Sequence, residues 1–192
     1  MDNSELDRDL GLLRRGEWMN GFTDGLRSAL AECEERCHRL NMLPPSRSAE
    51  REALIRQIFG SIGEKFIVHS PMHCDFGFNI HIGENFASNF NLTILDEAEV
   101  RIGDNIFIGP NATLSTITHD IRYAQRNAGI MKALPITIGN NVWIASNVTV
   151  LPGVTIGDGA VIGAGSVVTR DIPANTLALG TPCRPVKEIK QS

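Results

Sequence analysis

The clearest pattern of apolar and polar positions lies between Ile136 and Arg170, where an aliphatic residue recurs at every sixth position. A small residue usually follows the aliphatic one, and a second small or β-branched residue stands four positions after it. Neither the helical period of about 3.6 residues nor the strand period of two explains this spacing. A six-residue period is typical of a β-helix, in which short strands stack coil upon coil. The aliphatic positions are Ile138, Ile144, Val150, Ile156, Ile162 and Val168.

This spacing predicts a mainly β fold, a parallel β-helix of hexapeptide units in which three flat sides close one triangular coil. The aliphatic side chain points inward, where only the neighbouring coils can cover it. The small residue after it stands at a corner, where either a positive φ or a tight backbone approach would exclude larger side chains. The same frame continues upstream through Ile102, Ile108 and Leu114. Phe76, Ile82 and Ile94 follow a frame shifted by two, so we expect one irregular coil there.

Residues 1–60 have a different period, which predicts a helical N-terminal cap in front of a β-helix domain over residues 61–192. In one expected helix the apolar residues step by four and three, with Thr23 as the N-cap and Pro44-Pro45 as the end. A second helix is expected from about Ser48 to Gly60. Such helices can cover the open edge of the first coil. The apolar residues of the two helices are Leu26, Leu30, Cys33, Cys37 and Leu40, then Leu54, Ile55, Ile58 and Phe59.

Two groups of residues invite a metal interpretation, and we favour the plainer one for both. Cys33, Cys37 and His38 supply at most half of a zinc site, so we expect two small apolar residues beside a solvated histidine. A second group consists of three histidines spaced by four and eight positions. These spacings do not match a coil of about 18 residues, so their rings should not converge. This second group is His69, His73 and His81.

Polar residues mark three further segments. Residues 85–97 are rich in Asn, whose amides either stack along a corner or point into a cleft; both interpretations stay open. The sixfold frame breaks at an inserted loop, residues 115–135, which begins close to His119. Loops longer than about 12 residues in a compact domain are usually functional or disordered, so His119 is either catalytic or a solvated loop residue. Near the end, Arg184 and Lys187 form either a phosphate-binding patch beside Arg170 or a solvated terminus.

Composition narrows the function classes. The 192 residues suit one domain with a sizeable core and a helical appendage. A formal charge of -4 without a basic stripe argues against a nucleic-acid partner. No apolar run approaches the roughly 20 residues of a membrane span, and the acidic N-terminus does not look like a signal peptide. Four cysteines without disulfide-like density favour a reducing compartment. We therefore expect a cytoplasmic enzyme.

Several longer motifs are similar to those of the maltose/galactoside/nodulation O-acetyltransferases, a family of hexapeptide-repeat acyltransferases. The resemblance covers nearly the whole chain, and NFNLTILD together with the histidine loop is its most specific part. The motifs are CDFGFNIHIG (Cys74–Gly83), NFNLTILD (Asn89–Asp96), LSTITHD (Leu114–Asp120), ITIGNNVWIAS (Ile136–Ser146), LPGVTIGDGAVIGAGSVVTRDIP (Leu151–Pro173) and GTPCRPVKEI (Gly180–Ile189).

The resemblance implies a left-handed β-helix that transfers the acetyl group of acetyl-CoA to a sugar hydroxyl, in a homotrimer with sites between adjacent prisms. His119 matches the general base of the family, and no metal is required. The other implied catalytic residues are Asn89, in the acceptor pocket, and Glu97, at the family's acidic position. The implied acetyl-CoA residues are Trp143, Ser146, Ala164, Thr169, Arg184 and Lys187. The implied acceptor-binding residues are Asp75, Asn89 and Asp24.

Two departures from the family pattern concern the acceptor side. Glu97 is one carbon longer than the Asp of galactoside enzymes, and Asp75 is found in maltose-type relatives where galactoside-type enzymes have Ser. The acceptor therefore stays open between maltose- or glucose-type and galactoside-type sugars. Two other functions also stay open: a metal-dependent hydratase built on the same prism, and a non-catalytic trimeric scaffold.

Overall fold

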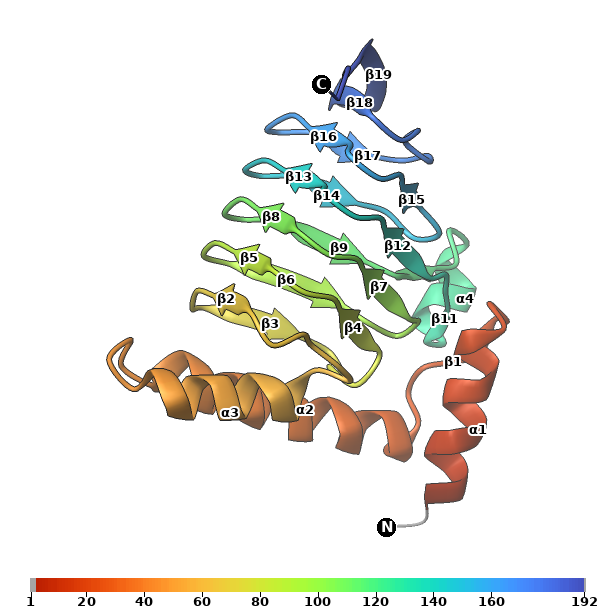
Figure 1. Ribbon diagram of the computed structural model, residues 1–192. Helices are drawn as coiled ribbons and strands as arrows, with labels where there is room; N and C mark the ends of the chain where they lie inside the picture. Colours follow the sequence, from red (N-terminus) through yellow and green to blue (C-terminus); the bar gives the residue numbers. More distant parts are fainter. Residues whose placement is uncertain (1–2, 192) are drawn as a thin grey trace.

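The chain folds into a left-handed parallel β-helix with helices packed at its N-terminal end, as a computed structural model of residues 3–191 shows (Figure 1). This confirms the expected mainly β fold. The helices at this end are α1 (Asn3–Arg14), α2 (Asp24–Met42) and α3 (Ser48–Ile58). None of the helices in the described part of the chain is long and apolar enough to cross a membrane.

Three parallel sheets form the sides of the prism. The four-stranded sheet contains β4 (Ile80–Ile82), β7 (Val100–Ile102), β12 (Ile136–Ile138) and β15 (Thr155–Ile156). The five-stranded sheet contains β3 (Met72–Cys74), β6 (Leu92–Leu95), β9 (Thr113–Ser115), β14 (Thr149–Val150) and β17 (Val167–Val168). The seven-stranded sheet contains β2 (Phe66–Val68), β5 (Phe86–Ser88), β8 (Ile106–Ile108), β13 (Trp143–Ile144), β16 (Val161–Ile162), β18 (Thr176–Gly180) and the antiparallel β19 (Cys183–Glu188).

The core consists of the predicted inward aliphatics, stacked in register from coil to coil. On the four-stranded sheet Ile82, Ile102, Ile138 and Ile156 pair in sequence, and each is at most 5% exposed. Each inward side chain is therefore covered by its counterparts one coil above and below, which is why the fold needs several repeats.

The irregularity expected from the shifted frame extends further than one coil. Phe66 pairs with Phe86 and Phe86 with Ile106, so these coils are 20 residues long, whereas Ile144 pairs with Ile162, 18 residues later. The two extra residues lie at the corner between the five-stranded and four-stranded sheets. We call this corner the acidic corner, because it carries Asp75, Asp96 and Glu97.

The other corners show whether positive φ or close backbone approach explains the small residues. The glycine after each inward aliphatic is required by close approach: a Cβ at Gly139 would lie 2.1 Å from Asp158 Oδ1. Positive φ occurs two residues later, chiefly at asparagines, for example 59° at Asn111. The Asn111 side chain donates to Asn147 Oδ1 (3.1 Å) and accepts from Asn91 Nδ2 (2.7 Å). Most of the Asn-rich segment therefore serves the corners.

The insertion is a folded hairpin rather than a plain loop. It leaves the acidic corner after β9, forms β10 (Ile117–His119), the short helix α4 (Tyr123–Asn127) and β11 (Ile130–Ala133), and returns to β12. Strand β1 (Met19–Asn20) pairs with β11, so the helical segment and the hairpin share one sheet.

The helical segment agrees with the predicted stripe and adds one helix. The Thr23 hydroxyl accepts from the Leu26 amide at 3.3 Å, and α2 ends at Met42, before the two prolines. Its buried residues are Leu26, Cys33, Cys37 and Leu40, whereas Leu30 is half-buried. Helix α1 was not predicted as a separate element.

Candidate active site

Asp96 organises the acidic corner from the inside. It follows β6 and is 0% exposed. Its carboxylate accepts backbone N–H groups from Asp75 (3.1 Å), Phe76 (2.9 Å) and Asn79 (3.3 Å), while the Asn79 amide donates to the Asp96 carbonyl (2.7 Å). Burial raises the pKa of Asp96 to about 6, although the amide donors oppose that shift. This carboxyl therefore holds the turn that presents Asp75.

Asp75 and Glu97 form a hydrogen-bonded carboxyl pair on the same corner. Glu97 is 8% exposed, and its Oε2 has no hydrogen-bond partner among the described residues. Burial, followed by the nearby charge of Asp75, raises the pKa of Glu97 to about 9, and burial also raises the pKa of Asp75. Two adjacent carboxyls with raised pKa values hold a proton between them near neutral pH. The pair can thus both donate and accept hydrogen bonds to a polar ligand.

His119 stands at the end of β10, on the hairpin that leaves the acidic corner. The base of the hairpin is fixed to the coil below, because the Thr116 hydroxyl donates to the Leu95 carbonyl (2.8 Å) and accepts from the Ala98 amide (3.0 Å). His119 pairs with Met131 across the hairpin, and its side chain is exposed. Within residues 3–191 the imidazole makes no hydrogen bond. The ring is therefore held on a fixed strand and is accessible to a ligand.

The corner between the seven-stranded and five-stranded sheets carries a second group of expected site residues, and we call it the Ser146 corner. Because Ser88 pairs with Ile108, Ile108 with Ile144 and Ile144 with Ile162, the residues that follow these positions stack in columns. Three expected site residues lie on this corner: Asn89, Ser146 and Ala164. The Asn89 Oδ1 accepts from the Phe90 amide at 2.8 Å, which leaves its NH₂ group for another acceptor.

The expected nucleotide-side residues lie on and beside the seven-stranded sheet. Lys187 of β19 pairs with Leu177, Leu177 with Val161 and Val161 with Trp143, so these side chains form one row. Lys187, Leu177 and Val161 line a cavity of about 640 Å³. Arg184, also on β19, is exposed and donates to the Cys183 carbonyl at 2.7 Å. Thr169 instead follows β17 and is exposed on the side of the acidic corner.

Asp24 lies on the helical side of the acidic corner. It is the first residue of α2 and, with Phe76 and Phe78 of the Asp75 turn, lines a cavity of about 590 Å³. Its side chain is 93% exposed and lies 3.8 Å from Arg27. The structure thus places Asp24 near the turn after Asp75 but records no contact between the two side chains.

The three upstream histidines do not form a site, as their spacing predicted. His69 follows β2, His73 lies on β3 and His81 lies on β4, so they belong to three different sheets. The His69 ring packs on Phe90 at 5.0 Å, and His81 Nδ1 lies 3.1 Å from Ser61 Oγ.

Sequence reasoning missed Asp96 and Thr116, the two residues that position the others. Both follow an inward-facing strand at the corner with two extra residues. An eight-residue step between Ile94 and Ile102, where six was expected, was the available signal.

A prism of six-residue units with a histidine hairpin at one corner defines the class of hexapeptide-repeat acyltransferases, and two family models match the chain. Residues 135–170 match the bacterial transferase hexapeptide (six repeats), and residues 14–63 match the maltose acetyltransferase hexapeptide capping motif. The second match covers α2 and α3, which close the first coil.

Individual relatives agree with both matches. Galactoside O-acetyltransferase of Escherichia coli K12 is 48% identical over 92% of this chain and 87% of its own length. Nodulation protein L of Rhizobium meliloti is 40% identical over 90% of this chain and 85% of its own. A solved galactoside acetyltransferase in complex with coenzyme A superposes with a TM-score of 0.92 at 46% identity, covering 95% of this chain and 91% of that one. The chain belongs to the maltose/galactoside/nodulation O-acetyltransferase family of acyltransferases.

Proposed function

We propose that this protein transfers the acetyl group of acetyl-CoA directly to a hydroxyl of a sugar, of the maltose/glucose or galactoside type, with His119 as general base. The proposal depends on one observation: the hydrogen bonds of Thr116 fix the start of the hairpin to the corner that also presents Asp75 and Glu97. The same rigid corner would therefore support both the general base, His119, and the two carboxyls that we propose bind the sugar. The relatives, named for galactoside acetyl transfer and nodulation, support the same chemistry.

The proposed mechanism follows from the weakness of a sugar hydroxyl as a nucleophile. An imidazole, with an ordinary pKa near 6.5, can take the hydroxyl proton as the oxygen attacks the thioester carbon, a contribution of typically ~10²–10⁴-fold. The C–S bond then breaks, and His119 returns the proton to the CoA thiolate. A backbone N–H near Ser146 is our candidate donor to the tetrahedral oxyanion, with an effect of typically ~10²–10³-fold. These steps need neither a metal nor a covalent acyl-enzyme.

The proposed acceptor side consists of Asp75, Glu97, Asn89 and Asp24. The Asp75–Glu97 pair can accept one sugar hydroxyl and donate to another, because it holds a proton near neutral pH. Glu97 also reaches one carbon further than Asp would, which changes the space left for the sugar. We place the choice of acceptor in these residues.

The proposed donor side follows the Ser146 corner and the seven-stranded sheet. Ser146 and Ala164 would lie along the pantetheine arm, Trp143 beside the groove, and Thr169 at its far side. Arg184 and Lys187 are exposed cations at the C-terminal end, suited to the phosphates of acetyl-CoA.

We also propose a homotrimer in which each site combines two chains. Asn89 precedes β6 and Glu97 follows it, so the two residues stand at opposite ends of a strand that rises roughly 3.3 Å per residue. One chain thus keeps the Ser146 corner apart from the acidic corner, whereas two adjacent prisms can place them face to face. We further expect residues 1–60 to act as the cap. The free thiol state of all four cysteines fits a cytoplasmic location.

The test is His119→Ala in the full chain, compared with His38→Ala on the exposed face of α2. We expect kcat for acetyl transfer to a panel of sugars, measured as CoA release, to fall by roughly 10²–10⁴-fold in the first variant only. Binding of acetyl-CoA, measured by calorimetry, should persist in both. Full activity in His119→Ala would remove this residue from the mechanism. Failure of the wild-type protein to bind acetyl-CoA saturably would reduce the molecule to a scaffold.

A further inference from the structure

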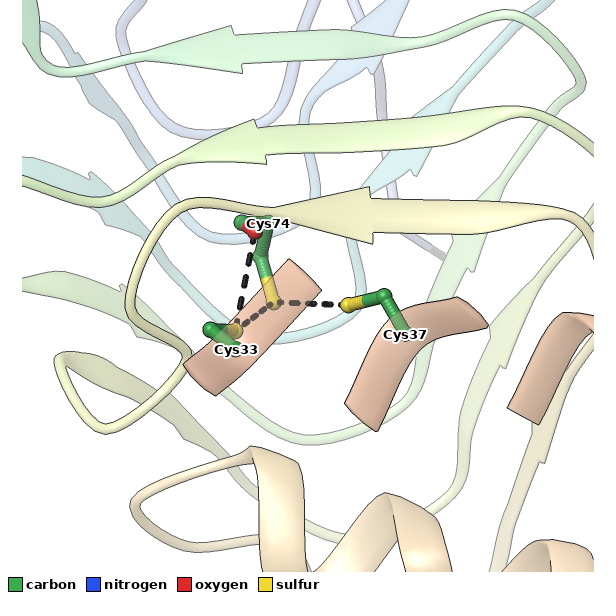
Figure 2. Close-up of side chains that lie close together, drawn as sticks. All are labelled: Cys33, Cys37 and Cys74. Atoms are coloured by element: carbon green, nitrogen blue, oxygen red, sulfur yellow. Dashed lines mark hydrogen bonds between the residues drawn. The ribbon is translucent and has the colours of Figure 1, made fainter. Parts of the chain in front are cut away.

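Three buried thiols meet where the helical segment covers the first coil. Cys33 and Cys37 stand one turn apart on α2, and Cys74 is the last residue of β3 (Figure 2). Cys33 Sγ lies 3.5 Å and Cys37 Sγ 3.7 Å from Cys74 Sγ, and the three sulfurs all lie within 4.8 Å of one another. The sequence suggested only half of a metal site, because the third thiol comes from a segment 37 residues further along the chain.

A fourth sulfur adjoins these thiols. Met72, two residues before Cys74 on the same inward face of β3, places its Sδ 3.9 Å from Cys37 Sγ and is 0% exposed. We call Cys33, Cys37, Cys74 and Met72 the sulfur cluster. Three thiols and a thioether form a set of soft ligands, and such sets select Cu(I) and related thiophilic ions over hard cations.

We propose that the sulfur cluster is a binding site for one Cu(I) ion, which joins α2 to the first coil. Three sulfurs around one ion at bond lengths of about 2.3 Å would lie about 4 Å apart, close to the spacing already present. The thioether favours Cu(I) over Zn(II), because zinc sites use thiolate, imidazole and carboxylate ligands. This proposal does not depend on the acetyl-transfer chemistry.

The surroundings suit a cation. The cavity of about 590 Å³ reaches Cys33 from the surface, and three of its lining residues, Glu5, Asp24 and Glu32, are acidic. Arg36 also lines it and pairs with Glu32.

The experiment titrates the reduced full-length protein with Cu(I) under anaerobic conditions, against a chromophoric Cu(I) chelator. We expect the protein to withdraw one equivalent per chain and its Tm to rise with occupancy, because an ion that binds only the folded state stabilises it. X-ray absorption at the copper edge should show a shell of sulfur ligands only. A parallel titration with Zn(II) and a zinc chelator should show weaker competition.

Variants identify the ligands. Cys37→Ser and Cys74→Ser should each weaken Cu(I) binding at least tenfold, since even an outer-shell change at a metal site typically costs ~10–100-fold. Cys183→Ser is the matched control: this buried cysteine lies on β19 at the other end of the prism and should leave binding unchanged. Met72→Leu conserves volume while removing the thioether, so it tests the fourth ligand in a chain that keeps its packing. Circular dichroism melts establish that each variant is folded.

Four outcomes of these binding measurements would overturn the proposal. They are failure of the wild-type protein to compete with the chelator, unchanged binding in a folded Cys74→Ser variant, nitrogen or oxygen ligands in the absorption spectrum, and stronger competition for Zn(II) than for Cu(I). A disulfide among these cysteines in protein purified without reductant would instead indicate a redox pair, and would equally overturn the proposal.

Discussion

At the scale of single residues, the Asp75–Glu97 pair is the most unusual feature of the corner. Two carboxyl groups share a partly enclosed position, and one oxygen of Glu97 has no partner among the described residues. A buried polar atom without a partner costs about 1–3 kcal/mol. Such a cost is retained where a ligand supplies the missing hydrogen bond, which is the role we propose for a sugar hydroxyl.

The raised pKa of Glu97 predicts how stability varies with pH. Its carboxyl titrates at about 9 in the folded protein, against about 4.5 as an isolated group, so the folded state binds more protons between these values. Stability from this group is therefore fully present below about pH 4.5 and is lost as the pH rises towards 9. Glu97→Gln, which cannot ionise, should become more stable than wild type by about 1–3 kcal/mol at the alkaline end.

Denaturant unfolding at a series of pH values measures this difference. Glu34→Gln, on the exposed face of α2, is the control and should show no such trend. A difference between Glu97→Gln and wild type that stays constant from pH 5 to pH 9 would contradict the assignment of the raised pKa to Glu97.

The exposed cations of β19 predict a second effect. Reversing the charge of Arg184 or Lys187 should raise KM for acetyl-CoA, and the rise should be steepest at low salt, because salt screens attraction to phosphate. Arg39→Glu, on α2, serves as the control. Steady-state kinetics at several salt concentrations test this, and an increase in KM that ignores salt would argue against a phosphate contact.

At the scale of elements, close approach between coils decides which corner positions must be glycine. A Cβ at Gly139 would meet Asp158 Oδ1 at 2.1 Å and the Asp158 amide nitrogen at 2.8 Å. The same atom at Gly11, within α1, would find Arg15 Nη1 at 3.5 Å as its nearest neighbour, which is ordinary contact. Close approach between coils therefore excludes a Cβ at position 139, whereas position 11 has room for one.

Alanine at these two positions should have opposite effects on stability. Gly139→Ala should cost about 1–3 kcal/mol through overpacking. Gly11→Ala should stabilise the protein by roughly 0.5–1 kcal/mol, because glycine is unfavourable inside a helix. Urea unfolding at one fixed protein concentration compares them, and equal effects would show that close contact between coils is not what Gly139 serves.

The sequence predicted the prism well, because its inward aliphatics are set by a period that depends only on local geometry. Ile138, Ile144 and Val150 all lie in the core as expected. It predicted the helix at Thr23 for the same reason: a cap hydroxyl and an apolar stripe are local features. Helix α1 and the hairpin strands β10 and β11 were not predicted. Strand β11 pairs with β10 and also with β1, which is distant in sequence, so part of this sheet leaves no local signal.

The candidate site residues stay a prediction from motifs, and their arrangement in space could not be predicted from the sequence. His119, Asn89 and Glu97 were chosen from motifs, yet no spacing along the chain indicates that Asn89 and Glu97 stand on different corners. Asp96 and Thr116 act through backbone groups of the coil below, and such contacts across coils leave no periodic signal in sequence. The proximity of Cys74 to Cys33 was not predictable either, because only tertiary packing brings the two residues together.

At the scale of the whole molecule, an apolar stripe runs along the outer side of the seven-stranded sheet. Ile67, Phe107 and Trp143 lie in one register row and are 58%, 60% and 52% exposed. Exposed apolar rows of this kind commonly mark an interface. In the proposed homotrimer, this face would pack against a neighbouring prism and bring the two corners together.

Replacing the middle of this stripe should therefore dissociate the assembly. In sedimentation equilibrium, the wild-type protein should have three times the 21.0 kDa mass of one chain, and the Phe107→Asp variant should have the mass of a single chain. This variant should also show little acetyl transfer. Met42→Asp, which changes another exposed apolar residue at the end of α2, should leave the trimer intact. A Phe107→Asp protein that stays trimeric, or a wild type that sediments as one chain, would contradict this arrangement.

The extra residues of the acidic corner have a consequence for how such a protein can diversify. Strand register is set within each coil, and the 115–135 segment both leaves and re-enters at a position where neighbouring coils already differ in length. Insertions, deletions or whole exchanges there would leave the stacked layers undisturbed. If the proposed roles hold, a lineage could vary the hairpin beyond His119 while keeping this base and the coenzyme-binding corner, so new acceptors would arise by changes in the hairpin and the interior of the β-helix would stay the same.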